Sequence, residues 1–370
     1  TPNLTDSGSV TFSEVDDTDL LNSSVALSGT TTTGPAIPSG LATALVSSVS
    51  LTQTGTNDGS IAWDFSVDNS LVQYLADGET ITATYTITVT DDSGTGNNTT
   101  TQDVTVTITG TNDQPTITVV DVIGAVTEDA TTPNLTDSGS VTFAEVDDTD
   151  LLNSSVALSG TSTTGPTIPS GLATALASSV SLTQTGTNDG TIAWDFSVDN
   201  SLVQYLADGE TITATYTITV TDDSGTGNNT TTQDVTVTIT GTNDQPTVTV
   251  VDVIGAVTED ATTPNLTDSG SVTFAEVDDT DLLNSSVALS GTTTTGPTIP
   301  SGLATALASS VSITQTGTND GSIAWDFSVD NSLVQYLADG ETITATYTIT
   351  VTDDSGTGNN TTTQDVTVTI

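Results

Sequence analysis

Apolar and polar residues alternate over long stretches of this chain, which is the pattern of β-strands that bury one face. Residues 61–67, 81–89 and 104–108 each carry an apolar side chain at every second position, with threonine, serine, aspartate or alanine between them. Side chains two positions apart lie on the same face of a strand, so each run predicts a strand with one buried face. The run 116–123 changes its inward parity at Val119–Val120, which predicts a bulge or a change of sheet there.

The same strand pattern occurs three times, because the chain is an internal repeat. The sequence TPNLTDSGSVTF begins at Thr1, Thr132 and Thr263, a constant spacing of 131 residues. A period of this length is too long for a solenoid and fits one autonomous domain. The expected domains are residues 1–114, which lack the first strand, 115–245, which are complete, and 246–370, which stop before an outgoing linker.

Within one period the pattern predicts an all-β fold. About seven strands at this spacing, each with one apolar face, are typical of an immunoglobulin-like, or cadherin-like, β-sandwich. Tandem sandwiches joined by short linkers predict an elongated rod. The only helical turn expected lies in NSLVQYLADGE, residues 200–210. The strands expected in the second repeat are 116–123, 138–146, 155–159, 179–184, 191–198, 211–221 and 230–240.

The composition adds one strong constraint, which is charge. The sequence has 47 Asp and Glu residues and no Lys, Arg or His, so its formal charge is −47. No side-chain salt bridge can form, and no basic surface exists for nucleic acid or anionic lipid. Repulsion on this scale weakens a compact chain, so cations from solution must supply the counter-charge. No apolar run approaches the ~20 residues that a membrane span needs, so we expect neither nucleic acid as a partner nor membrane insertion.

The sequence also lacks the residue types that most enzymes use for catalysis. General base chemistry near neutral pH usually uses His, which is absent, as is Cys. Pairs of carboxylates alone could serve glycoside hydrolysis, but the candidate acids recur in each copy. A catalytic site is not expected three times in tandem, so we predict that the chain is not an enzyme.

The acidic residues collect in loops at the two ends of each predicted sandwich. The loops after 138–146, 179–184 and 211–221 face the incoming linker, while the loops before 138–146 and before 211–221 face the outgoing one. Each joint therefore gathers carboxylate and amide oxygens from two domains and the linker. Ca²⁺ accepts six to eight oxygen ligands in irregular cages, whereas zinc and copper favour the missing His and Cys. Loops kept acidic only for solubility are the alternative interpretation.

The predicted cofactor is Ca²⁺, bound at the joints between domains. Its candidate ligands are Asp77, Glu79, Asn112, Asp113, Asp147, Asp148, Asp150 and Asp222 at the first joint, and Asp208, Glu210, Asn243, Asp244, Asp278, Asp279, Asp281 and Asp353 at the second, with Glu128 beside the outgoing linker of the second repeat. We expect the first joint to be the weaker one, because the first repeat lacks a counterpart of Glu128.

Four motifs recur along the chain: VTED, EVDDTD, LADGETITATYTITVTDDSGT and TQDVTVTITGTNDQP. Over the whole period they resemble the VCBS repeat of large bacterial surface adhesins of the RTX type. The resemblance implies tandem immunoglobulin-like domains in a secreted protein on the surface of a Gram-negative cell. A second likeness, to cadherins, rests on Asp208-Gly209-Glu210, Asn243-Asp244 and Asp279-Thr280-Asp281, and it implies Ca²⁺ at the joints. Gly209 and Gly241 depart from the cadherin pattern, so one or two ions per joint are expected.

These features together predict a structural extender: a Ca²⁺-stiffened stalk of an extracellular adhesin that serves cell adhesion or biofilm formation. Near identity of the copies favours spacing over recognition, because a specific binding site is needed only once. Two alternatives stay open, namely a subunit of a self-assembling extracellular fibre or surface layer, and a module that binds glycans or neighbouring cells. The expected partners are Ca²⁺ ions, the neighbouring repeats and, in a fibre, other copies of the chain.

Overall fold

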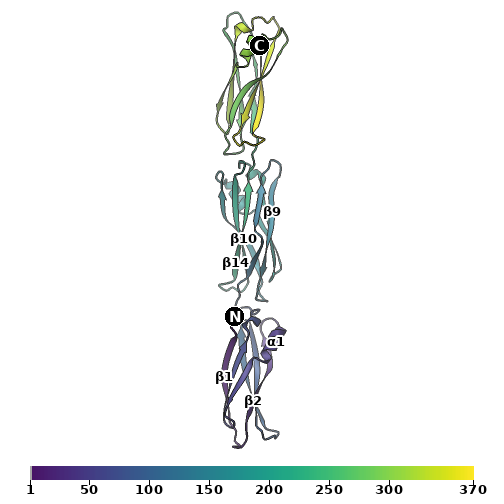
Figure 1. The fold of residues 1–370 in the computed structure, drawn as a ribbon, viewed down its shortest axis with the longest axis vertical. Coiled ribbons are helices and arrows are strands. Elements are labelled where there is room, and N and C mark those ends of the chain that lie inside the picture. Colours follow the sequence, from purple (N-terminus) through teal and green to yellow (C-terminus); the bar gives the residue numbers. More distant parts are fainter. Residues whose placement is uncertain (1) are drawn as a thin grey trace.

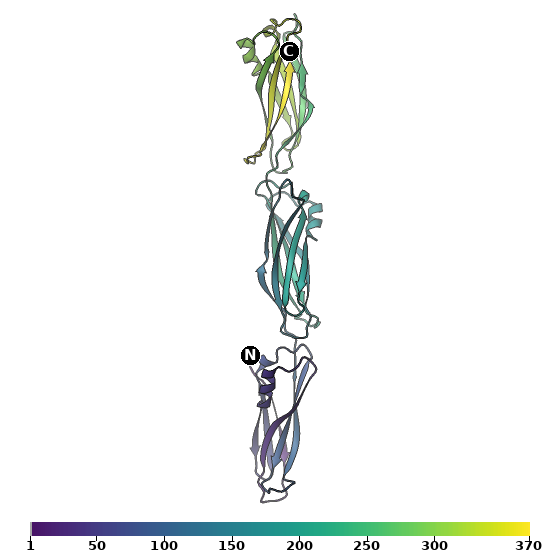
Figure 2. The same cartoon turned by 90° about the vertical axis from the view of Figure 1, so that its right-hand side faces the viewer.

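Three β-sandwiches lie end to end and form an elongated rod (Figure 1). The computed structural model describes residues 2–370. Every sheet is built from the strands of a single repeat, and each repeat has two sheets. Figure 2, turned by 90°, shows the same end-to-end order of the repeats. The predicted fold class, tandem all-β sandwiches arranged as a rod, is confirmed.

Each repeat consists of long strands, one short α-helix and one turn of 3-10 helix. Repeat 1 contains β1 (Leu4–Phe12), β2 (Asn22–Thr32), α1 (Ser39–Val46), β3 (Val49–Thr54), β4 (Gly59–Val67), η1 (Asn69–Leu71), β5 (Thr80–Thr90) and β6 (Thr99–Thr109). Repeat 2 contains β7 (Thr116–Asp121), β8 (Ile123–Thr127), β9 (Asn134–Ala144), β10 (Asn153–Thr163), α2 (Ser170–Leu176), β11 (Val180–Thr185), β12 (Gly190–Asp199), η2 (Asn200–Leu202), β13 (Thr211–Thr221) and β14 (Thr230–Thr240). Repeat 3 contains β15 (Thr247–Asp252), β16 (Ile254–Ala256), β17 (Asn265–Ala275), β18 (Asn284–Thr294), α3 (Ser301–Leu307), β19 (Val311–Thr316), β20 (Gly321–Asp330), η3 (Asn331–Leu333), β21 (Ile343–Thr352) and β22 (Thr361–Thr369).

Repeat 2 shows the strand order of an immunoglobulin-like sandwich. One sheet has the order β11-β12-β9-β7, and the other has the order β10-β13-β14-β8. Neighbouring strands are antiparallel, except that β8 runs parallel to β14. Repeat 3 has the same two four-stranded sheets, whereas repeat 1 has two three-stranded ones, β1-β4-β3 and β2-β5-β6.

The predicted first strand, 116–123, crosses from one sheet to the other. Its first part, β7, pairs with β9, and the register shifts between Val119 and Asp121. Its second part, β8, pairs with β14 of the opposite sheet. The irregularity predicted at Val119–Val120 is therefore present as a register shift, and the change of sheet follows it, between Asp121 and Ile123. Because the strand is split, repeats 2 and 3 each have eight strands where about seven were expected.

The alternating residues build one core between the two sheets of repeat 2. In β13 every second residue is buried, and the residues between them are half-buried threonines. Trp194 and Tyr216 are at most 1% exposed, and the Tyr216 ring packs edge to face on Phe196 with ring centroids 6.4 Å apart. The indole N–H of Trp194 donates to the carbonyl oxygen of Asp121 at 2.7 Å, which fastens the split first strand to the core. Buried aromatic side chains of this size contribute much of the stability of a small domain.

One helix per repeat was not expected from the sequence, so the prediction of a single helical turn is wrong. The missed helix in repeat 2 is α2, which places Leu172 and Leu176 in the core with no exposed surface. Seven residues make about two turns, which is too short for a helical period to stand out. The turn that was expected within 200–210 is present as η2. Among residues 2–370, no helix combines the length and apolar character needed to cross a membrane.

Candidate functional site

The acidic loops meet the linkers at two joints, one between repeats 1 and 2 and one between repeats 2 and 3. At joint 1 the backbone N–H of Asp113 donates to Oδ2 of Asp147 at 2.8 Å, and the Asn112 amide donates to Oδ2 of Asp222 at 3.3 Å. At joint 2 the backbone N–H of Asp244 donates to Oδ2 of Asp278 at 2.8 Å. The predicted convergence of the linker with the loops of the following repeat is therefore present at both joints.

The loop after β9 turns alternate side chains toward joint 1. Glu145 is 7% exposed and Asp147 has no exposed surface, whereas Val146 between them is 46% exposed and Asp148 lies on the surface. The Asn188 side chain holds the loop, because its amide donates to the carbonyl oxygens of Asp147 at 2.8 Å and Asp150 at 3.1 Å. The backbone of the loop is thus fixed by hydrogen bonds while its carboxylates point into the joint.

Several of these buried oxygens have no hydrogen-bond partner, although more than about 90% of buried polar groups in proteins have one. In the part of the chain that the structure describes, the unpartnered joint atoms are Asn112 Oδ1, Glu145 Oε2, Asp147 Oδ1 and Asp150 Oδ2 at joint 1, and Asn243 Oδ1, Asp244 Oδ2, Glu276 Oε2, Asp278 Oδ1 and Asp281 Oδ2 at joint 2. All nine are acceptors, and a chain without basic side chains offers them no cation. The hydroxyl groups of Tyr74 and Tyr205, on the preceding repeats, are also buried without a partner. Their arrangement leaves a set of oxygen ligands without a positive partner.

Two members of this set, Glu145 and Glu276, are absent from the ligands predicted from the sequence. Both open the motif EVDDTD, and both are 7% exposed. One carboxylate oxygen of Glu145 accepts the backbone N–H of Val146 at 2.7 Å, and the other oxygen has no partner. The signal was present in the sequence, since Glu145 shares the parity of Asp147 two positions later.

The carboxylates of the joints do not form a closed cage in the part of the chain that the structure describes. Among residues 2–370, no group of three or more acidic side chains has an arrangement that could hold a metal ion as it stands. Mutual repulsion between carboxylates without a counter-ion favours this open arrangement. Rotation of the free carboxylate groups would be needed to bring their oxygens onto one ion.

Among residues 2–370, the corresponding loop of repeat 1 contacts neither a linker nor another repeat. This loop carries Glu14, Asp16 and Asp19, which correspond to Glu145, Asp147 and Asp150. Asp16 is exposed, and Glu14 and Asp19 are only partly buried. The sequence of the loop therefore does not bury its acids, and contact with the incoming linker and repeat does.

Burial changes the acidity of the joint carboxylates. Burial, and then the charges of neighbouring acids, raises the pKa of Asp147 to about 7 and that of Asp278 to about 8. The same causes, with Asp222 and Asp353 as the neighbouring charges of largest effect, raise the pKa of Asp150 and of Asp281 to about 6. A cation in the joint would offset this cost, because it favours the charged form of each acid.

The preceding repeat contacts the joint directly. The backbone N–H of Asp148 donates to the carbonyl oxygen of Tyr74 at 3.1 Å, and the Thr149 hydroxyl donates to Oε1 of Glu79 at 2.9 Å. Joint 2 has the same two contacts, from Asp279 to Tyr205 and from Thr280 to Glu210. Four predicted ligands lie exposed at the rim of the joints, namely Asp77, Asp148, Asp208 and Asp279.

The remaining predicted ligand, Glu128, is buried against the outgoing linker. Its Oε1 accepts the backbone N–H of Thr242 at 2.6 Å, and its Oε2 accepts the side-chain amide of Gln204. Both oxygens are therefore engaged in hydrogen bonds with the protein. In this structure Glu128 positions the linker that leads to Asn243 and Asp244.

The metal-free chain is expected to lose stability as the pH rises from about 4 to about 8. In the unfolded chain an aspartate has a pKa near 4, whereas folding raises the pKa of Asp147 to about 7 and that of Asp278 to about 8. Between these pKa values the folded state holds protons that the unfolded chain has released. The resulting contribution to the free energy of unfolding is lost as the pH rises through the pKa values of the folded state. Urea unfolding of chelator-treated protein across this range measures it.

The matched control is the double variant Asp147→Asn, Asp278→Asn. Between pH 5 and 8 its free energy of unfolding should depend less on pH than that of the parent, because ordinary carboxylates titrate below about pH 5. A slope equal to that of the parent would mean that the pH dependence comes from general charge repulsion.

Comparison with known proteins yields similar folds only. No family model matches the chain, and no curated protein matches its sequence. Similar solved structures include the cadherin-like domains 1 to 4 of zebrafish RET, with 11% identity and a TM-score of 0.24 over 95% of this chain and 65% of that chain. Another is a mutant of the adhesin CfaE of enterotoxigenic E. coli, with 12% identity and a TM-score of 0.30 over 70% of this chain and 86% of that chain.

These scores are too low to support an argument about function. The fold assignment rests on the strand order of the repeats, and it is consistent with cadherin-like domains. The resemblance to VCBS repeats, which the motifs carry, stays a prediction.

Proposed function

We propose that this chain is a spacer segment of an extracellular adhesion protein, in which Ca²⁺ bound at the joints stiffens the row of repeats. One observation carries the proposal: four buried acceptor oxygens without a partner recur at equivalent positions in both joints, and joint 2 adds a fifth, Asp244 Oδ2. The two joints share this feature because they share a sequence, so the property belongs to the repeat unit and would recur in a longer array.

The donor set favours Ca²⁺ over other common metals. The unpartnered atoms are carboxylate and side-chain amide oxygens, which suit hard divalent ions. Ca²⁺ tolerates irregular shells of six to eight oxygens, whereas Mg²⁺ demands a near-octahedral shell and keeps much of its water. At joint 2 the ion would be held by Asp278, Asp281, Glu276 and Asp244, with Asn243 as a neutral ligand. These residues come from the linker and from the repeat that follows.

The location of these oxygens connects metal binding with mechanical function. Asp244 belongs to the linker and Asp278 to the following repeat, while Glu210 of the preceding repeat holds Thr280 of the same loop. An ion that draws Asp278, Asp281 and Asp244 together would restrict rotation about the linker. A rod made of stiff joints holds its end at a fixed distance from its attachment point, which is what a spacer requires.

Calcium is expected to stabilise the chain by specific binding rather than by screening. A ligand that binds only the folded joint raises stability by about 2.7 kcal/mol per site when its free concentration is about 100 times the Kd. Monovalent salt acts only by screening, with a Debye length of about 10 Å at 0.1 M. Thermal unfolding in millimolar CaCl₂ should therefore show a higher midpoint than in NaCl of equal ionic strength. Equal midpoints in the two salts would refute site binding and leave diffuse screening.

A further inference from the structure

The two linkers of repeat 2 attach to neighbouring strands that run in the same direction. The incoming linker leads into the first strand, β7 and then β8, and the outgoing linker follows β14. Strand β8 is parallel to β14, with Ile123–Thr127 opposite Thr236–Thr240. A pull along the rod in Figure 1 therefore draws β8 toward joint 1 and β14 toward joint 2. The two strands would have to slide past each other, so the evenly spaced hydrogen bonds of the parallel pair carry the load together.

Hydrogen bonds close this strand pair at both of its ends. The backbone N–H of Thr236 donates to the carbonyl oxygen of Val122 at 3.0 Å, and that of Glu128 donates to the carbonyl oxygen of Thr240 at 2.9 Å. Between these two bonds the register has no bulge. The pair therefore reaches from the crossing of the first strand to the point where the outgoing linker begins.

The side chain of Glu128 continues the connection onto the outgoing linker. It is 1% exposed, its Oε1 accepts the backbone N–H of Thr242 at 2.6 Å, and its Oε2 accepts the side-chain amide of Gln204. Thr242 follows β14 by two residues. Tension in the outgoing linker therefore reaches the bonds of Glu128 before it reaches the strand pair.

The first strand is also fastened to the opposite sheet. Its first part, β7, pairs with β9. In its second part, β8, the backbone N–H of Ala125 donates to Oδ2 of Asp137 in β9 at 2.7 Å. Between the two parts, the indole N–H of Trp194 donates to the carbonyl oxygen of Asp121. Sliding of β8 along β14 would break these contacts as well.

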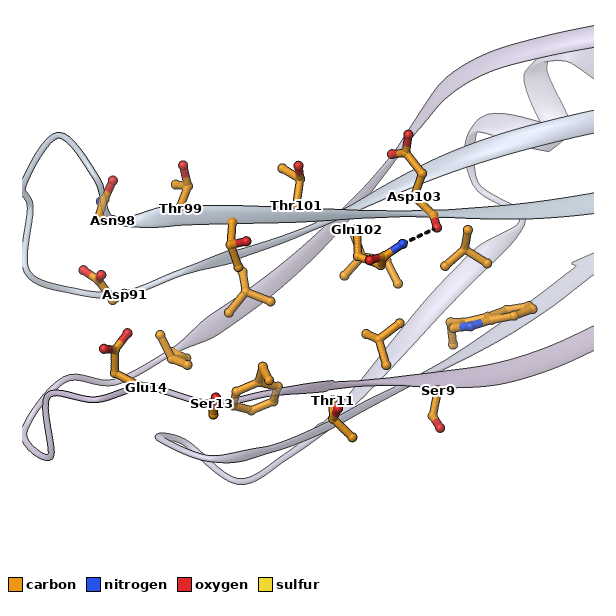
Figure 3. Close-up of a pocket in the computed structure, with 18 of the residues that line it drawn as sticks. Ser9, Thr11, Ser13, Glu14, Asp91, Asn98, Thr99, Thr101, Gln102 and Asp103 are labelled. Atoms are coloured by element: carbon orange, nitrogen blue, oxygen red, sulfur yellow. Dashed lines mark hydrogen bonds between the residues drawn. The ribbon is translucent and has the colours of Figure 1, made fainter.

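Repeat 1 shows how the two edges lie where, among residues 2–370, no strand joins them. Its strands β1 and β6 correspond to β9 and β14 of repeat 2. Figure 3 shows Ser9 to Glu14 and Asn98 to Asp103 on opposite sides of a groove of about 860 Å³. In repeat 2, β7 and β8 pair with the corresponding edges. The first strand thus connects the two sheets on this side, and a load that enters it reaches both of them.

We propose that the β8–β14 pair, closed beside the outgoing linker by the Glu128 side chain, is a clamp that keeps repeat 2 folded under tension. Strands pulled along their length lose their connecting bonds in one step, whereas strands pulled apart at one end lose them one after another. Forced unfolding is governed by the rate of unfolding, so the direction of the pull decides the force. Repeat 3 has the same parallel pair, β16 with β22, so the clamp belongs to the repeat unit. Its use rests on the proposed function, because a spacer is under tension when both of its ends are attached.

The direction of pulling tests the clamp on the intact chain. The sequence has no cysteine, so two introduced cysteines are the only attachment sites for the DNA handles of an optical trap. Gln114→Cys with Gln245→Cys loads repeat 2 along the rod. Asp208→Cys with Gln245→Cys loads the same repeat from one end, where β13 and β14 open bond by bond. We expect a higher unfolding force in the first geometry, and equal forces in the two would overturn the proposal.

Two substitutions separate the clamp from general stability. Glu128→Ala removes the contacts to Thr242 and Gln204 and should lower the force in the first geometry toward that in the second. The matched control is Val156→Ala, which removes core contacts of β10 at the far edge of the same sheet. It should lower stability in urea and leave the force in the first geometry unchanged.

An unchanged force in Glu128→Ala, or an equal fall in Val156→Ala, would also overturn the clamp. All of these measurements are made with chelator present, and both handles lie on the linkers or the loop of repeat 2. The result is therefore independent of Ca²⁺ binding, and failure of the clamp is distinguishable from failure of the proposed function.

Discussion

Removal of Ca²⁺ is expected to turn a straight rod of three repeats into a chain of beads that bend at both joints. Without an ion, the buried oxygens of Asp147 and Asp278 repel their acidic neighbours, and the joints gain freedom. Strands of 11 residues such as β13 span about 36 Å at about 3.3 Å per residue, so a straight row of repeats exceeds 100 Å. Small-angle X-ray scattering should show a smaller mean radius of gyration and a broader distance distribution after chelation, restored by added Ca²⁺.

The double variant Asp147→Asn, Asp278→Asn is the control for this experiment. Its scattering curves with Ca²⁺ and with chelator should coincide, because each joint has lost a charged ligand for the ion. Distance distributions of the parent chain that coincide in Ca²⁺ and in chelator would show that the joints are stiff without metal and would refute the proposed role of the ion.

Replacing Asp278 alone with asparagine is expected to have opposite effects in the presence and absence of Ca²⁺. With Ca²⁺, joint 2 should lose roughly 100-fold or more in affinity, since ligand charge tunes calcium binding over several orders of magnitude. Without Ca²⁺, the variant should be more stable than the parent near neutral pH. The reason is that asparagine removes a fully buried acid whose burial raises its pKa to about 8.

Asp279→Asn is the matched substitution for this prediction, because Asp279 is the next residue in the chain and is exposed. It should change affinity far less and leave the metal-free stability almost unchanged, as expected for a surface position. Calorimetric titration counts the ions, and urea unfolding gives the stability with and without metal. A lower stability of Asp278→Asn under both conditions would indicate a purely structural role for this side chain.

The strands were largely predictable from the sequence, because a strand with one buried face carries an apolar residue at every second position. The segment 211–221 was expected as a strand, and β13 has the same limits. The bulge or change of sheet near Val119–Val120 was visible for the same reason, as a break in that period. The helix α2 was not visible, because Leu172 and Leu176 alone cannot establish a helical period and only contact with the sandwich core holds them.

For the joints, the sequence determined the charge and the order of the loops. A chain with 47 acidic residues and no basic ones must take its counter-ions from solution. Strands of regular length that alternate in direction put every second loop at the same end of a sandwich, so the acids had to meet the linker. These conclusions need only composition and topology.

Only the tertiary structure decided which acids face the joint. Asp147 and Asp148 are neighbours with the same chemistry, yet Asp147 has no exposed surface and Asp148 lies outside. The bonds from Asn188 to the loop backbone and from the N–H of Asp113 to Asp147 set this orientation. In repeat 1 the same loop leaves Asp16 exposed, because burial there depends on a linker and a domain that lie outside the loop's own sequence.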